Sequence, residues 1–229
     1  MAITLVVNLG VTYMKRCLAF DIGLVLCHVS LKPFEDFVFE NTGITPEKTQ
    51  EWLDDVNIQL DLGVWTIGQA ATTLSRNLDQ KKATDAWLKC LSVSEEMDHA
   101  IMALQDIGFT TVFLSNIGYD HRDAIMSGKS FSIARTEKEN TCGKFFSCER
   151  DMRKPQRIYF EEAVHCYPDL EGALFFEDRP ENRKAAKGIL NPVEFNLNCF
   201  DNDTQAAKKL YEHVLRRYTL GDLPPPSTS

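Results

Sequence analysis

The sequence lacks any apolar run long enough to cross a membrane, because no stretch reaches the roughly 18 apolar residues of a spanning helix. It also has no Cys-x-x-Cys pair, and an odd total of seven cysteines indicates neither a disulfide framework nor a zinc site. Basic residues are few: 25 Lys and Arg stand against 33 Asp and Glu, which gives a net charge of −8. An acidic chain repels the phosphate backbone of nucleic acids. We therefore expect a cytoplasmic protein that binds neither membrane nor nucleic acid.

The two ends of the chain carry little of the pattern of a folded domain. Residues 2–11 are largely apolar, but no basic residue precedes them, which disfavours a signal peptide. Met14 is followed by two basic residues and is a candidate start of the fold, so we assign residues 1–13 to an N-terminal extension. Residues 221–229 contain three prolines and no apolar periodicity, and we assign them to a flexible tail.

Between the ends, strand and helix patterns alternate. Short apolar runs predict strands, and apolar residues at helical spacing predict helices between them. The predicted strands cover 17–26, 110–114, 145–148, 173–176 and 193–197, and the predicted helices lie near 97–104, 160–167, 182–189 and 207–215. This alternation predicts an α/β fold, a Rossmann-like parallel sheet with helices on both faces. The polar segment 127–143 gives no assignment.

Residues 31–91 interrupt the alternation. They show almost no strand signal, and apolar residues recur there at helical spacing. Thr45 followed by Pro46 has the form of a helix start, an N-cap residue and then proline. We therefore expect a small inserted α-helical cap at 31–91, with 14–30 and 92–220 forming the core.

Polar residues fall at the ends of three predicted strands, where ligands bind in parallel sheets. Asp21 ends the first, Ser115 and Asn116 follow the second, and Glu177-Asp178 follows the third. A carboxylate can attack phosphorus, hydroxyl and amide groups can donate to phosphate oxygens, and paired carboxylates suit Mg²⁺. Taken alone, Asp21 and Ser115-Asn116 are better explained as turns or helix caps, whereas for the acid pair a metal site and a helix N-terminus are equally good explanations.

Lys154, which precedes Pro155 and a predicted helix, adds a cation to this set. A lysine in a phosphate site supplies a point charge that stabilises negative charge in the transition state. Alone, Lys154 would be one exposed lysine among many.

Together these pieces resemble the haloacid dehalogenase-like (HAD) hydrolase superfamily, in the phosphatase type with a helical cap inserted after the first motif. The resemblance spans roughly residues 16–200 and is carried, in order, by FDIGLVL, VFLSN, RKPQRIY and LFFEDRPENRKAA. It implies that Asp21 is the nucleophile and forms an aspartyl-phosphate, assisted by Lys154. It implies Mg²⁺ on the side chain of Asp21, the backbone carbonyl of Gly23 and the carboxylate of Asp178, with Glu177 nearby. It also implies that Ser115, Asn116 and Lys154 surround the phosphoryl group.

Two positions depart from this pattern. Phosphatases of the superfamily commonly have a second aspartate, a general acid and base, where this chain has Gly23. Its loss typically costs about 10²–10⁴-fold in rate, unless another group supplies the proton. His28 could be that group, although a packing or surface role is the better explanation for one histidine. The second departure is Leu24, where this branch often has glycine or asparagine.

The function predicted from these motifs is magnesium-dependent hydrolysis of a small phosphate monoester, such as a sugar phosphate, by a monomer or homodimer. One alternative is a catalytically impaired protein that keeps the fold for binding or regulation, with Gly23 as a step in the decay. Another is a haloacid dehalogenase, which uses the same aspartate but no metal. The fold alone cannot choose among these, because one scaffold hosts many chemistries.

Overall fold

The computed structural model describes residues 16–127 and 142–219 of the chain. The predicted extension at 1–13 and the tail at 221–229 lie outside the described residues. Five parallel strands form the central sheet in the order β5-β4-β1-β6-β7. Their bounds are β1 Cys17–Phe20, β4 Thr110–Ser115, β5 Cys142–Phe146, β6 Leu174–Glu177 and β7 Asn191–Glu194. The predicted fold class, a parallel α/β sheet covered by helices, is confirmed.

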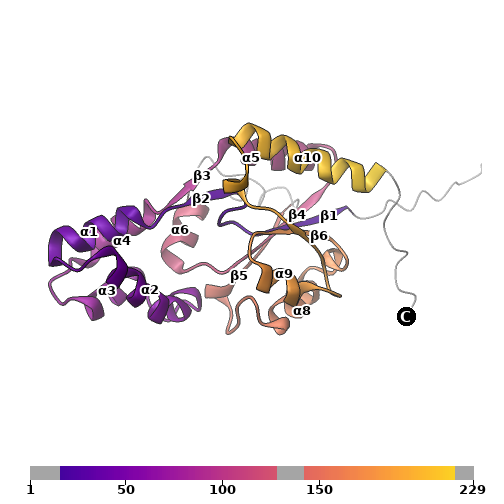
Figure 1. Ribbon diagram of the computed structural model, residues 1–229. Coiled ribbons are helices and arrows are strands. Elements are labelled where there is room, and N and C mark those ends of the chain that lie inside the picture. The colour runs from indigo at the N-terminus through magenta and orange to yellow at the C-terminus, as the bar shows by residue number, and fades with distance from the viewer. Residues whose placement is uncertain (1–15, 128–141, 220–229) are drawn as a thin grey trace, which may run out of the picture.

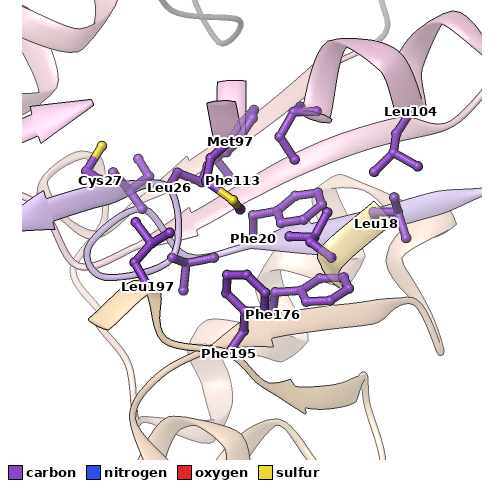
Figure 2. Packing of buried hydrophobic residues seen from close by; sticks show 14 of the residues in the cluster. Leu18, Phe20, Leu26, Cys27, Met97, Leu104, Phe113, Phe176, Phe195 and Leu197 are labelled. Atoms are coloured by element: carbon purple, nitrogen blue, oxygen red, sulfur yellow. The ribbon is translucent and has the colours of Figure 1, made fainter. Parts of the chain in front are cut away.

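Helices cover both faces of the sheet, as Figure 1 shows. They are α5 Glu95–Asp106 and α10 Asp203–Thr219 on one face, and α8 Arg157–Cys166 and α9 Pro180–Ala186 on the other. Side chains alternate along each strand, so that Leu18 and Phe20 of β1 join one hydrophobic cluster while Ala19 joins the other. In the first cluster the rings of Phe20 and Phe176 stack with centroids 5.1 Å apart (Figure 2).

The prediction for residues 17–26 is wrong in its second half. Strand β1 ends at Phe20, and the following residues form a tight turn in which the Ile22 carbonyl accepts hydrogen bonds from the Leu26 and Cys27 amides. The chain then continues as β2 Cys27–Val29, which pairs antiparallel with β3 Leu91–Val93. The strand and most of the turn are both buried, so both are apolar, and the sequence pattern does not show where the strand ends.

Four helices follow β2, and strand β3 comes after them. They are α1 Lys32–Thr42, α2 Pro46–Asp61, α3 Ile67–Leu74 and α4 Gln80–Leu88. Their apolar faces form a hydrophobic cluster of their own around Phe34, whose ring contacts both Trp52 and Trp87. Thr66 begins α3 with a capping box, in which Thr66 and Gln69 bond each other's backbone amides. The helical pattern predicted for this stretch therefore rests on ordinary amphipathic packing.

The helical segment 32–88 lies beyond the carboxyl ends of the sheet strands (Figure 1). Helix α6 Tyr119–Ser127 follows β4 and reaches it: Asp120 accepts a hydrogen bond from the Ile67 amide, and the His121 ring stacks on Trp87. Among the described residues, no helix has both the length and the apolar character needed to cross a membrane. The edge of the sheet that carries the polar strand ends thus faces a second packed layer.

Candidate active site

Asp21 and Lys154 form the centre of the site. Asp21 directly follows β1, and its Oδ1 lies 2.9 Å from the Lys154 Nζ and accepts a 2.7 Å hydrogen bond from the Ile22 amide. The Lys154 side chain is 1% exposed, and its Nζ also lies 2.6 Å from Oε2 of Glu177 at the end of β6. Burial lowers the pKa of Lys154, but attraction to Asp21 and Glu177 outweighs burial and leaves the pKa above its ordinary value. A buried, charged lysine therefore joins two carboxylates from neighbouring strands.

The residues at the end of β4 hold this pair in place. The Ser115 hydroxyl lies near Asp21 and favours its ionised form, which lowers the pKa of that carboxyl group. The Asn116 amide makes two 2.8 Å bonds to Lys154, one accepted from its N–H and one donated to its carbonyl. The Asn116 side chain is thus engaged in fixing the lysine backbone, and its predicted contact with a phosphoryl group stays a prediction.

Three carboxylates converge at the same edge of the sheet. Ligand oxygens of Asp21, Glu177 and Asp178 all lie within 4.8 Å of one another. Burial raises the pKa of Asp21 to about 6, even though Lys154 opposes it, and burial also raises the pKa of Asp178. One lysine therefore leaves this set short of positive charge, and oxygen donors in such an arrangement suit a hard divalent cation such as Mg²⁺.

The members of this cluster differ in how much of their bonding capacity is used. Glu177 is fully buried, with one oxygen on Lys154 Nζ and the other accepting from the Arg179 amide at 3.0 Å. Asp178 is half-buried and forms no ion pair with a lysine or arginine among the described residues. Asp178 is therefore the better metal ligand of the two, and Glu177 is better placed to orient Lys154.

Gly23 offers only its backbone. A bridge flanks it, in which Cys27 N donates to Ile22 O and Leu24 N donates to Cys27 O, so the Gly23 carbonyl takes no part in these bonds. An added Cβ would meet only Val29 Cγ2, at an ordinary contact distance of 3.5 Å. Glycine is therefore not required here by lack of space, and what the position lacks is a carboxylate.

A cavity of about 180 Å³ lies between the sheet edge and the helical segment, and its lining includes Ile22 and Gly23, which follow Asp21 in the chain. The sheet side contributes Gly23 and Ser115, and the helical side contributes Asp61 and Trp87. The rest of the lining is Ile22, Val29, Leu31, Asn57, Leu60, Cys90, Leu91, Asn116, Ile117, Gly118, Asp120 and His121. No lysine or arginine is among these described lining residues, so the cavity is mostly apolar with a few acidic groups.

His28 is not brought to this site. Its Nε2 lies 2.9 Å from Oδ1 of Asp203, at the start of α10, and the residue does not line the cavity. Asp120 accepts a hydrogen bond from the amide of Ile67, the first residue of α3. Trp87 borders the cavity, whereas Trp52 packs on Phe34 in the helical cluster.

Two further charged residues at the site have no signal in the sequence. Asp61 ends α2, and its Oδ2 lies 2.7 Å from the Arg153 Nη2. Burial raises the pKa of Asp61 to about 6, although Arg153 and Lys154 oppose this. In the sequence, Asp61 is one of several acidic residues of α2. It differs from the others because the end of α2 lies against the loop that contains Arg153.

Comparison with solved structures places this arrangement in a known fold. A HAD-like family hydrolase from Porphyromonas gingivalis superposes with a TM-score of 0.67 at 22% identity, over 86% of this chain and 98% of the other. A HAD family enzyme from Bacteroides thetaiotaomicron, in complex with magnesium and inorganic phosphate, gives 0.63 at 20% identity, over 78% and 93%. A 2-haloacid dehalogenase from Pseudomonas syringae gives 0.56 at 16% identity, over 90% and 100%.

The chain has the fold of the haloacid dehalogenase-like superfamily, as these structures show. No model of a protein family matches the sequence, and neither does any curated protein. The neighbours include both a phosphate-bound enzyme and a dehalogenase, so the fold alone leaves the chemistry open.

Proposed function

We propose that this protein is a hydrolase of small phosphate monoesters, with Asp21 as the nucleophile. The observation that carries the proposal is the buried ion-pair chain from Asp21 through Lys154 to Glu177, with Asp178 beside it. A nucleophilic aspartate must be ionised, and Lys154 favours the ionised form. The acid pair has a direct use in a phosphatase, whereas dehalogenation needs no metal.

Each residue of the chain then has a role around the phosphoryl group. Asp21 attacks phosphorus, and Lys154 stabilises the negative charge that builds up on the phosphoryl oxygens. Ser115 favours the ionised form of Asp21 and can donate to a phosphate oxygen, and Asn116 fixes the position of Lys154. Water then hydrolyses the aspartyl-phosphate and restores Asp21.

The proposed cofactor is Mg²⁺, held by the Asp21 carboxylate, the Gly23 carbonyl and Asp178, with Glu177 nearby. When bound, it would neutralise the repulsion between an anionic nucleophile and an anionic substrate. The raised pKa values of Asp21 and Asp178 support this assignment, because they mark carboxyl groups without enough compensating charge.

We further propose that residues 31–91 act as a cap over a core formed by 14–30 and 92–220. A cavity of about 180 Å³ is bordered by residues of both parts. The leaving group should therefore be small, such as a short alcohol. The cytoplasm is the compartment we propose, and the quaternary state stays a prediction of monomer or homodimer.

The first test is phosphate release from a panel of small phosphate monoesters, with Mg²⁺ and with chelator, beside the Asp21→Asn variant. We expect release that needs Mg²⁺ and falls by at least about 10³-fold in the variant, since the amide cannot act as the nucleophile. Asp201→Asn, an exposed acid away from the site, is the matched control and should keep full activity.

The alternatives give different results in the same assay. A folded protein that releases phosphate from no compound would overturn the proposal and favour a binding protein. Metal-independent halide release from a 2-haloacid, lost in Asp21→Asn, would instead identify a dehalogenase.

A further inference from the structure

Breaking a phosphate ester of an ordinary alcohol requires a proton at the leaving oxygen, because an alkoxide is a poor leaving group. The proton donor must border the cavity in which that oxygen lies. Among the described lining residues, the side chains with an acid-base group suited to this task are Asp61, Asp120 and His121.

Two of these three side chains, Asp120 and His121, already form hydrogen bonds with backbone groups. Asp120 Oδ2 accepts the Ile67 amide bond at 2.8 Å, which requires an ionised or accepting carboxylate at the start of α3. His121 Nε2 lies 2.9 Å from the Trp87 carbonyl, so its ring proton is bound there, and burial lowers the pKa of His121. A neutral imidazole fixed in that tautomer has no second proton to give.

Asp61 differs from both in its position and its contacts. It borders the same cavity as Gly23 and Ser115, and its side chain is 11% exposed. The carboxylate bonds Arg153 through Oδ2, while the Ser147 hydroxyl fixes the Asp61 backbone carbonyl at 2.6 Å. The charged groups that act on Asp61 are Arg153, Lys154, Arg179 and Asp21. The carboxyl group is therefore held at the cavity wall by an ion pair on its side chain and a hydrogen bond on its backbone carbonyl.

We propose that Asp61 is the general acid and base of the hydrolysis, a role that rests on the proposed phosphatase function. In the first step an Asp21 oxygen forms a bond to phosphorus, the bond from phosphorus to the ester oxygen breaks, and the Asp61 proton passes to that oxygen. In the second step Asp61 takes a proton from water as the water oxygen bonds to phosphorus and the bond to Asp21 breaks. The products are the alcohol and inorganic phosphate, and both aspartates return to their starting states.

The environment of Asp61 suits both halves of this cycle. Its pKa, raised to about 6 by burial against the opposing effect of Arg153, lies near neutral pH, where both protonation states are accessible. The proton would thus come from the helical segment that borders the cavity rather than from the loop after β1.

Leaving-group dependence tests the proposal directly. Acetyl phosphate and n-propyl phosphate have similar sizes, but acetate leaves readily without a proton and propanol does not. We expect Asp61→Asn to lower kcat/KM about 10²–10⁴-fold for propyl phosphate, and by less than about tenfold for acetyl phosphate, because protonation matters little there.

Arg153→Gln is the matched control for a merely structural role of the ion pair. It breaks the same contact but keeps the acid, so it should lower kcat/KM for both substrates by the same factor. If Asp61→Asn also lowers both equally, Asp61 only positions the helical segment and the proposal is wrong. If the wild-type protein hydrolyses neither compound nor any other monoester, the phosphatase function fails instead, which is a separate result.

Discussion

At the scale of single residues, Leu24 has an unfavourable backbone conformation that hydrogen bonds to other residues maintain. It is the one non-glycine residue with a positive φ in the described part of the chain, at 57°. Its amide donates to the Cys27 carbonyl at 2.8 Å, and its own carbonyl accepts from the Leu197 amide at 2.7 Å. The left-handed conformation costs an ordinary residue about 1–2 kcal/mol. This accounts for the glycine or asparagine that the resemblance leads one to expect at position 24.

The effect of a substitution at Leu24 on the free energy of unfolding should therefore depend on how well the new residue tolerates a positive φ. Asparagine tolerates the left-handed region, so we expect Leu24→Asn to change the free energy of unfolding by less than about 1 kcal/mol. A β-branched side chain does not, so Leu24→Val should destabilise by about 1–2 kcal/mol relative to Leu24→Asn. Urea unfolding of both variants measures the difference. Equal losses in the two variants would mean that leucine packing, and not backbone strain, sets the stability there.

The sequence predicted much of the candidate site at this scale because strand order determines it. Asp21, Ser115 and Glu177 each end a buried strand, and parallel neighbours bring those ends together. The engagement of Asn116 with the Lys154 backbone could not be predicted, because it depends on how one loop folds against another. Asp61 was missed for the same reason, since it reaches the site from a separate helix.

At the scale of elements, the pattern of apolar residues predicted helices and strands well where one face or one whole element is buried. The helices at 32–88 and the strands β4 and β6 followed that rule, whereas the strand predicted at 17–26 extended too far past β1. The short ribbon of β2 and β3 did not, because each of its strands has only three residues and little apolar alternation. Strands β2 and β3 flank the helical segment and pair only because its two ends lie side by side. No local sequence pattern predicts that arrangement.

The contact between this ribbon and α10 gives a pH-dependent prediction. His28 on β2 pairs with Asp203 at the start of α10, where burial tends to raise the Asp203 pKa but hydrogen bonds from Ser94 and His28 outweigh burial and lower it. A carboxyl group whose pKa is lower in the folded state contributes stability above its unfolded pKa, near 3.8, and loses it as the pH falls through the folded pKa.

We therefore expect Asp203→Asn to lower the free energy of unfolding by up to about 1 kcal/mol at pH 7, a modest value because the pair is partly exposed. The gap between variant and wild type should be constant above about pH 4 and should narrow as the pH falls below that value, because Asp203 is protonated only below its unfolded pKa of 3.8. Urea unfolding at these pH values measures it, with Asp201→Asn as the control. A gap that stays constant with pH would assign the effect to packing and not to charge.

At the scale of the whole molecule, the helical segment is joined to the sheet at several separate points. Asp61 pairs with Arg153, Ser147 donates to the Asp61 carbonyl, and Asp120 accepts from Ile67. An added Cβ at Gly63 would meet the Cys148 carbonyl at 2.8 Å, so the chain also passes closely there. These contacts enclose the cavity, and its lining should therefore select the leaving group.

The charge of the lining leads to a prediction about substrates. The cavity is bordered by two acidic side chains, Asp61 and Asp120, with no lysine or arginine among the described residues around it. A leaving group that carries a second negative charge would find no cationic partner there and would lie near the negative charge of Asp120, an arrangement that costs several kcal/mol. Glycerol 3-phosphate and 3-phosphoglycerate are a matched pair, since they differ mainly in a hydroxymethyl group against a carboxylate. We expect kcat/KM to be at least about tenfold higher for the neutral member, a difference of ~1.4 kcal/mol.

A single added cation should reverse this preference if charge is its cause. Asn57 lines the cavity from the exposed side of α2, so a longer side chain there should not disturb the fold. Asn57→Lys should narrow or invert the gap between the two substrates, whereas Asn57→Gln, of similar polarity but without charge, should leave it unchanged. If the carboxylate substrate is already preferred by the wild type, the enclosed cavity does not hold the leaving group, and the substrate must extend instead toward Arg153 and Arg179 at the edge of the site.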